Sequence, residues 1–66
     1  KRSGPISINR ATVSDFDSLD GIGPVIARRI IEYRKTHGPF MTIEDLQKVS
    51  GIGVAKFAQI KSKIRI

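Results

Sequence analysis

Two short glycine-containing segments are the part of this sequence that could bind a ligand through the main chain. Gly21-Ile22-Gly23 lies within L-D-G-I-G-P-V-I-A, and Gly51-Ile52-Gly53 lies within V-S-G-I-G-V-A-K-F. Glycine costs about 1 kcal/mol relative to alanine inside a helix, so neither pair favours helix continuation. Glycine permits the positive φ of a sharp reversal and leaves N–H groups uncovered at the start of the next helix. Because the helix dipole adds positive partial charge there, each segment predicts an anion site that suits a phosphate oxygen.

The charge of the chain also favours an anionic partner. The 66 residues carry twelve Lys and Arg against six Asp and Glu, which gives a formal net charge of +6. The excess lies in the second half, where residues 34–66 hold seven basic and two acidic side chains and no acid follows Asp45. Such an imbalance indicates nucleic acid or an anionic membrane surface, although a solvated basic surface would give the same composition.

Other kinds of site find little support in the sequence. The chain has no cysteine and one histidine, His37, so we expect no metal site and no cofactor. We also expect no enzyme activity and no small-molecule substrate, because the serines share this single histidine and paired carboxylates have no evident pocket. Neither G-x-G-x-x-G nor G-K-[ST] occurs, which excludes Rossmann and P-loop phosphate sites. No apolar run approaches the roughly 18 residues of a membrane span.

The chain repeats itself at an offset of 30 residues. The identical pairs include Thr12/Thr42, Asp15/Asp45, Gly21/Gly51, Ile22/Ile52 and Gly23/Gly53. Internal self-similarity of this kind indicates a duplicated unit that buries its apolar face against its copy. We therefore expect an all-α fold of four main short helices, arranged as two pseudo-twofold related hairpins. Hairpin one would span residues 12–37 and hairpin two residues 42–64, within a domain of residues 6–66 that follows a disordered arm at 1–5.

Capping residues and apolar spacing predict where the helices begin and end. Each copy has a threonine followed three residues later by an aspartate, which resembles a capping box. Pro24 suits a first helical turn, and Gly38 ends the helix that it begins. The expected helices span about residues 13–19, 24–37, 43–49 and 54–62. Residues 6–8 and 64–66 alternate apolar and polar side chains, which fits either a minimal strand pair or extended coil.

A helix, a hydrophobic-x-G-I-G turn and a second helix together resemble the helix-hairpin-helix pattern. With I-x-Y-R, G-P-F and T-I-E-D-L at these spacings, residues 6–66 resemble the C-terminal DNA-binding domain of ComEA-type competence proteins. The resemblance implies a tandem helix-hairpin-helix fold that binds double-stranded DNA without sequence specificity, each hairpin holding phosphates of one strand across the minor groove. It also implies a module for DNA uptake, tethered outside the cytoplasmic membrane by a segment beyond these residues. Through that longer chain it would meet other competence proteins.

Position by position, the resemblance places phosphate contacts at both glycine turns. The implied segments are Gly21, Ile22, Gly23 and Val25 in the first hairpin, and Gly51, Ile52, Gly53, Ala55 and Lys56 in the second. Further side-chain candidates are Arg28, Lys48 and Lys63, followed by Arg29, Lys35 and Lys61. Lys56 is the strongest single candidate because it lies in the first turn after a G-I-G. Since Asp20 opposes phosphate where the second copy has Ser50, and since hairpin two carries Lys48, Lys56 and Lys63, we expect hairpin two to bind more tightly.

Two other roles stay open on the sequence alone. The same fold can serve as a protein-interaction or scaffold module, and an acidic partner protein would produce the same basic composition. The domain could also hold DNA for a catalytic domain carried on a longer chain. A salt titration against unrelated DNA sequences separates DNA binding from a scaffold role, because phosphate contacts weaken steeply as salt rises.

Overall fold

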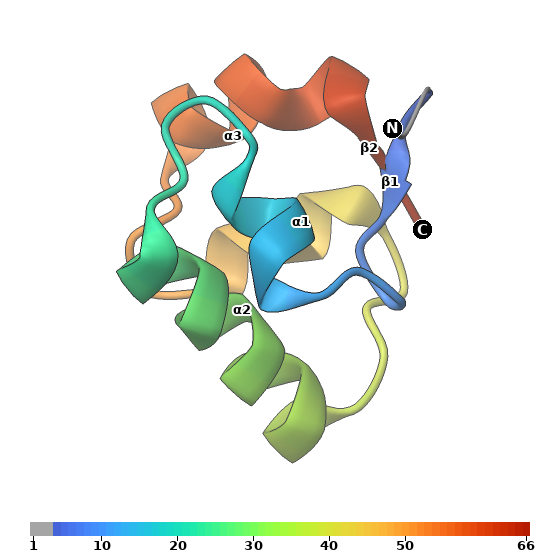
Figure 1. Ribbon diagram of the computed structural model, residues 1–66. Helices are drawn as coiled ribbons and strands as arrows, with labels where there is room; N and C mark the ends of the chain where they lie inside the picture. Colours follow the sequence, from blue (N-terminus) through green and yellow to red (C-terminus); the bar gives the residue numbers. More distant parts are fainter. Residues whose placement is uncertain (1–3) are drawn as a thin grey trace.

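The computed structural model describes residues 4–66, so the first three residues of the expected arm lie outside the described part. The elements follow in the order β1 (Ile6–Ser7), α1 (Val13–Asp17), α2 (Pro24–His37), the 3₁₀-helix η1 (Ile43–Lys48), α3 (Val54–Ile60), the 3₁₀-helix η2 (Lys61–Lys63) and β2 (Ile64–Arg65). The all-α tandem hairpin is therefore confirmed, with one small strand pair added to it (Figure 1). Gly4 and Pro5, also expected in the arm, are exposed and lead into β1.

The 30-residue repeat is visible in the core of the molecule. Matching positions of the two copies are buried as pairs: Phe16/Leu46, Leu19/Val49, Ile22/Ile52, Ala27/Phe57 and Ile30/Ile60. These side chains belong to one apolar cluster rather than to two. A single hairpin is too small to bury its own apolar face, so each copy serves as the cover of the other.

The capping hydrogen bonds confirm the predicted start of the first helix in each hairpin. In α1 the Thr12 hydroxyl accepts the Asp15 N–H at 3.2 Å, and the Asp15 carboxylate accepts the Thr12 N–H at 3.0 Å. In η1 the Asp45 carboxylate accepts the N–H groups of Met41 at 3.2 Å and Thr42 at 3.4 Å. Both helices thus begin one residue after a threonine, as the capping pattern predicts.

The predicted ends of these helices, at residues 19 and 49, are wrong. α1 stops at Asp17, and the second copy is a 3₁₀-helix that stops at Lys48. Both copies continue instead through i→i−3 hydrogen bonds, in which the N–H of residue 19 reaches Phe16 O at 3.0 Å and that of Ile22 reaches Leu19 O at 3.1 Å. Because side chains three apart eclipse one another in such a turn, residues 16, 19 and 22 all face the core.

The other predicted helices need one correction. α2 covers residues 24–37 as expected, with Pro24 in its first turn and Gly38 at its end. The last helix was expected to reach residue 62, but α3 ends at Ile60 and the chain tightens into η2. The tighter turn brings Ile64 into β2, where it pairs with Ile6 of β1.

The two ends of the chain form a parallel strand pair, which resolves the choice between strands and extended coil. Ile6 lies opposite Ile64 and Ser7 opposite Arg65, and the Ser7 hydroxyl donates to the Ile66 carbonyl at 2.6 Å. Figure 1 shows β1 and β2 at the right of the molecule, away from the glycine turns. The strand pair therefore closes the fold on the side opposite to the candidate site.

The segment before α1 is also tied to the link between the hairpins. The Asn9 side-chain amide bonds both main-chain groups of Phe40, accepting its N–H at 2.7 Å and donating to its carbonyl at 3.0 Å. The Arg34 guanidinium donates to the carbonyls of Ile8 at 2.8 Å and Ala11 at 3.0 Å. Arg34 is thus a structural residue, in contrast to the exposed basic residues of α2.

Candidate nucleic-acid interface

The first glycine of each G-I-G segment is needed by the fold. In turn one (residues 21–23) Gly21 has φ +86°, and in turn two (residues 51–53) Gly51 has φ +102°. A Cβ added to Gly21 would lie 2.8 Å from Oε1 of Gln59. A Cβ added to Gly51 would lie 3.2 Å from both Nη1 of Arg29 and Cγ1 of Ile26. The positive φ therefore favours glycine at both positions, and close packing against Ile26 adds to this at Gly51.

The isoleucine in the middle of each turn is an anchor rather than a ligand group. Ile22 and Ile52 are 4% and 3% exposed, so their side chains belong to the core. Their N–H groups donate to the carbonyls of Leu19 and Val49, each at 3.1 Å. The sequence analysis included both residues in the phosphate-contacting segments. In the structure their N–H groups are instead hydrogen-bonded within the protein.

The second glycine of each turn is required neither by conformation nor by packing. Gly23 and Gly53 have φ −96° and −97°, which any residue can adopt. A Cβ added at either position would meet no atom within 4 Å. Each glycine is the N-cap of the following helix, yet it has no side chain to cap that helix. What glycine provides at these positions is an open approach to the main chain.

The main-chain donors next to these glycines point to a ligand-accessible surface. Among residues 4–66, the N–H groups of Gly23 and Val25 at one tip, and of Gly53 and Ala55 at the other, make no hydrogen bond within the protein. Val25 and Ala55 are also exposed. The uncovered donors expected from the sequence are therefore present at both helix starts, where the helix dipole favours an anion.

Each glycine turn lies against the other hairpin, and both turns are on one side of the molecule. Nζ of Lys56, in α3, donates to the Gly21 carbonyl at 2.7 Å, so turn one adjoins the start of α3. Nη1 of Arg29, in α2, donates to the Ser50 carbonyl at 3.3 Å, so turn two adjoins the first half of α2. Figure 1 shows both turns at the left of the molecule, opposite β1 and β2.

The basic residues singled out from the sequence have different positions in the structure. Lys56 is half-buried and bonded to turn one, while Lys63 lies with its Nζ 3.9 Å from Oδ2 of Asp20. Nζ of Lys48 lies 3.5 Å from Oδ1 of Asp45, at the cap of η1. The remaining candidates, Arg28, Arg29, Lys35 and Lys61, are exposed. The structure thus brings Lys56 and Lys63 to turn one, whereas the sequence assigned them to hairpin two.

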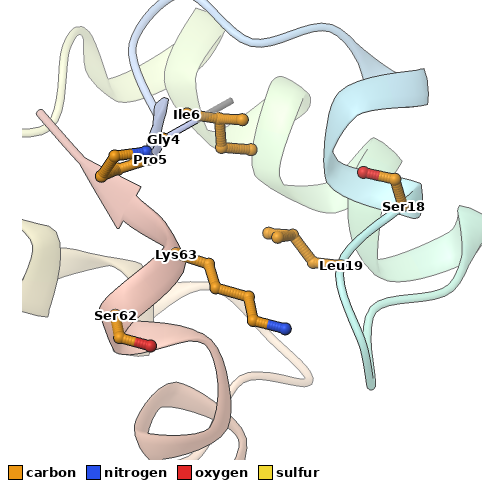
Figure 2. Close-up of a pocket in the computed structure, with 7 residues that line it drawn as sticks. All are labelled: Gly4, Pro5, Ile6, Ser18, Leu19, Ser62 and Lys63. Carbon is orange, nitrogen blue, oxygen red and sulfur yellow. The ribbon is translucent and has the colours of Figure 1, made fainter. Parts of the chain in front are cut away.

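A pocket of about 390 Å³ lies between residues 4–6, the segment that leaves α1 and the end of hairpin two. Figure 2 shows the Lys63 side chain extending across it toward the segment of Ser18 and Leu19. The remaining lining residues are Gly4, Pro5, Ile6 and Ser62. This lining provides no acid and base pair for hydrolysis.

Within residues 4–66, no three His, Asp or Glu side chains gather where they could hold a metal ion. None of the described helices is long and apolar enough to cross a membrane.

Comparison with known proteins places this geometry in a family. The family model described as the helix-hairpin-helix motif matches residues 1–65. ComE operon protein 1 of Bacillus subtilis is 48% identical over 61 residues, which cover 92% of this chain and 30% of that protein. The human endonuclease/exonuclease/phosphatase family domain-containing protein 1 is 42% identical over 59 residues, or 89% of this chain and 10% of that protein. An uncharacterized protein of Haemophilus influenzae is 41% identical over 63 residues, 94% of this chain and 56% of that protein.

These matches set both the family and the extent of the similarity. The chain spans less than two thirds of the length of each of these three relatives, so the similarity concerns this domain and not the whole of those proteins. The repeated turn, the caps and the family match agree, and the resemblance noted in the sequence is confirmed. The chain belongs to the helix-hairpin-helix family.

Proposed function

We propose that this domain binds double-stranded DNA without sequence specificity, through main-chain N–H groups at its two glycine turns. The observation that carries the proposal is the open space at Gly23 and Gly53, where an added Cβ would meet nothing within 4 Å. Since neither residue needs to be glycine for the fold, the missing side chain serves the approach of a ligand to the main chain.

The chemistry of these donors favours a phosphate. The N–H groups of Gly23 and Val25, and of Gly53 and Ala55, open the first turns of α2 and α3, where an anion is stabilised. The net charge of +6 attracts a polyanion to this surface. We place the two tips on the two strands that border a minor groove.

Contacts of this kind imply weak and non-specific binding. Main-chain donors to phosphates position a protein on DNA but carry no sequence information. We therefore expect a Kd on the order of 10⁻⁴–10⁻⁶ M at physiological salt, with a steep loss of affinity as salt rises.

We place the domain within a longer DNA-uptake protein, where it acts as the DNA receptor module. The resemblance to ComEA-type competence proteins and the 48% identity to ComE operon protein 1 support this role. A second candidate is a DNA-holding domain attached to an enzyme, which is favoured by the 42% identity to a protein named for an endonuclease/exonuclease/phosphatase domain. Both roles use the same contacts with DNA.

The test is to fill the open space at each tip. Gly23→Val and Gly53→Val should keep the fold, because both backbones are extended and an added Cβ meets nothing within 4 Å. Each change should weaken binding of a labelled duplex by about tenfold, since charge-assisted hydrogen bonds to phosphate are lost. Fluorescence anisotropy at low salt measures the affinity, and circular dichroism checks the fold.

Ser14→Val, which places the same valine side chain at an exposed position of α1, is the control and should bind like the wild type. Two duplexes of unrelated sequence should give the same Kd within about twofold. If the wild type binds neither duplex at low salt, the domain is a protein-interaction module instead. Valine variants that bind as well as the wild type would remove the glycine turns from the interface.

A further inference from the structure

Each hairpin sends a cationic side chain to the glycine turn of the other hairpin. Lys56, on α3 of hairpin two, donates from Nζ to the Gly21 carbonyl at 2.7 Å. Arg29, on α2 of hairpin one, donates from Nη1 to the Ser50 carbonyl at 3.3 Å. These bonds join residues 35 and 21 positions apart, so they depend on how the two hairpins pack.

The contacts follow the repeat, but the cations do not occupy matching positions. Turn one faces residues 56 and 59, and turn two faces the matching residues 26 and 29. At the first position α3 has Lys56 and α2 has Ile26. At the second position the order is reversed, because α3 has Gln59 and α2 has Arg29. Each turn is therefore faced by one cation. At turn one the cation stands at the first of the two matching positions, and at turn two it stands at the second.

Turn one has no cation in its own local sequence and lies beside an acid. The first residues of α2 after the turn, Pro24, Val25 and Ile26, are uncharged, and Asp20 precedes the turn. The Lys56 ammonium brings a positive charge to the carbonyl of the first residue of the turn. Lys63, also from hairpin two, lies 3.9 Å from the Asp20 carboxylate and offsets its charge (Figure 2 shows the lysine reaching toward this segment). Both charges that favour a phosphate at turn one therefore come from the other hairpin.

Turn two is served in the same way from hairpin one. The Arg29 guanidinium lies close enough to turn two that a Cβ at Gly51 would be 3.2 Å from its Nη1. A guanidinium has five N–H donors. Within the described chain, the hydrogen-bond acceptor found for the Arg29 guanidinium is the Ser50 carbonyl. The other donors of Arg29 remain for a phosphate that sits on turn two.

We propose that the two hairpins exchange cations, so that Lys56 completes the phosphate site of turn one and Arg29 completes that of turn two. This inference rests on the proposed function and concerns which turn each cation serves. It differs from the assignment by sequence position, under which Lys56 acts at the turn that it directly follows. The consequence is that loss of Lys56 damages binding at the opposite hairpin.

A double-mutant cycle on DNA binding tests the exchange. Lys56→Met keeps the aliphatic stem and removes the charge, so the fold should be retained. In the otherwise wild-type domain we expect Lys56→Met to weaken duplex binding by about fivefold. With turn one already blocked by Gly23→Val the further loss should shrink below about twofold, and with turn two blocked by Gly53→Val it should stay near fivefold. Arg29→Gln should show the opposite pattern.

Lys61→Met controls for charge alone, because Lys61 is an exposed lysine on η2. Lys61→Met should weaken duplex binding by less than Lys56→Met does, and by the same factor in the Gly23→Val and Gly53→Val backgrounds. The exchange is overturned if Lys56→Met loses its effect in the Gly53→Val background, or if its effect is the same in both backgrounds. The proposed function is tested separately, since wild-type domain that binds no duplex at low salt removes both proposals, whereas an additive cycle removes only the exchange.

Discussion

The two hairpins share one backbone arrangement and differ in the side chains that it carries. Both have a capped first helix, a positive-φ glycine, a buried isoleucine and an open glycine at the start of the second helix. They differ where charge reaches the turns, at the pairs Asp20/Ser50, Ile26/Lys56 and Arg29/Gln59. Under the proposed function, the shared backbone sets where a phosphate would bind, and the charges that favour it are divided between the two copies.

The second helices also differ in length, for reasons that lie outside the turns. α2 has 14 residues, and its last turn is held by Tyr33, whose ring stacks on His37 at 4.0 Å and on Phe40 at 5.5 Å. α3 has 7 residues, because the chain must tighten into η2 before Ile64 can pair with Ile6. The longer helix thus supports the link between the hairpins, and the shorter one leads to the closing strand pair.

The largest difference between the two turns should appear in stability when their first glycines are replaced. Gly21→Ala and Gly51→Ala should each destabilise the domain by about 1–3 kcal/mol, because both backbones have positive φ. We expect Gly51→Ala to cost more. Its new Cβ meets the half-buried Ile26 at 3.2 Å, whereas the Cβ at Gly21 meets the end of the exposed Gln59 side chain, which can rotate away.

Urea unfolding followed by circular dichroism gives the two free energies. Gly38→Ala is the matched control, because Gly38 has φ +85° and an added Cβ there meets nothing, so its loss reports backbone strain alone. A larger loss for Gly21→Ala than for Gly51→Ala would mean that turn one is the more tightly packed of the two.

A smaller difference concerns the cap of η1 in hairpin two. Desolvation raises the pKa of Asp45, but the N–H of Met41, the Lys48 ammonium and the N–H of Thr42 together outweigh it and hold that pKa below its ordinary value of 3.8. A lowered pKa in the folded state stabilises the fold above the ordinary value, and this stabilisation is lost as pH falls through the folded value. Asp45→Asn should therefore weaken the domain at neutral pH and flatten the loss of stability in acid.

The measurement is the urea midpoint at a series of pH values between about 2 and 7, for the wild type and for Asp45→Asn. The difference in urea midpoint between the wild type and Asp45→Asn should be constant above about pH 5 and should decrease below about pH 4. A gap of the same size at every pH would show that the carboxylate charge contributes nothing and that Asn caps η1 differently.

The features that the sequence predicted are local ones. The turns, both helix starts and the buried positions 16, 19 and 22 with their counterparts depend on glycine, threonine and apolar residues only a few positions apart. Capping and spacing rules act at that range, so they can be read from one sequence. The end predicted for the first helix, at residue 19, was wrong because the fit of that residue against the core, rather than its helix propensity, decides how the chain leaves α1.

The features that the sequence could not predict join distant residues. Spacing alone gave no signal that Lys56 would reach the Gly21 carbonyl, 35 positions away, or that Arg29 would reach Ser50. The pairing of the chain ends, with the Ser7 hydroxyl on the Ile66 carbonyl, spans 59 positions. These contacts depend on how the two hairpins pack against each other. The repeat indicates that they pack, but it does not fix which side chains meet.

The expectation that hairpin two binds DNA more tightly remains a prediction, but its physical basis changes. It depended on Lys48, Lys56 and Lys63, and the structure brings the last two to turn one. What remains for turn two is the absence of an acid at Ser50 and the approach of Arg29. The difference between the hairpins should therefore be modest, and the pair Asp20/Ser50 is the place to measure it.

The smallest expected effect comes from the acid beside turn one. Asp20 and Lys63 are 80% and 55% exposed and 3.9 Å apart, so their interaction is that of a surface pair, about 0–1 kcal/mol. Because Lys63 already offsets much of this charge, Asp20→Ser should raise duplex affinity by only about twofold at low salt. In a Lys63→Met background the same change should raise affinity by more, about fourfold, because the acid is then uncompensated.

Fluorescence anisotropy at low salt measures all four proteins of this cycle, and a repeat at high salt should abolish the differences, because exposed charges are screened. Ser50→Asp is the mirror variant, since it gives turn two the acid that turn one has. Because Arg29 donates to the Ser50 carbonyl, the new carboxylate would compete with phosphate for this guanidinium, so Ser50→Asp should lower affinity by more than Asp20→Ser raises it. If Asp20→Ser has the same effect with and without Lys63, then Lys63 does not compensate the acid. The difference between the hairpins would then depend on Lys56 and Arg29 alone.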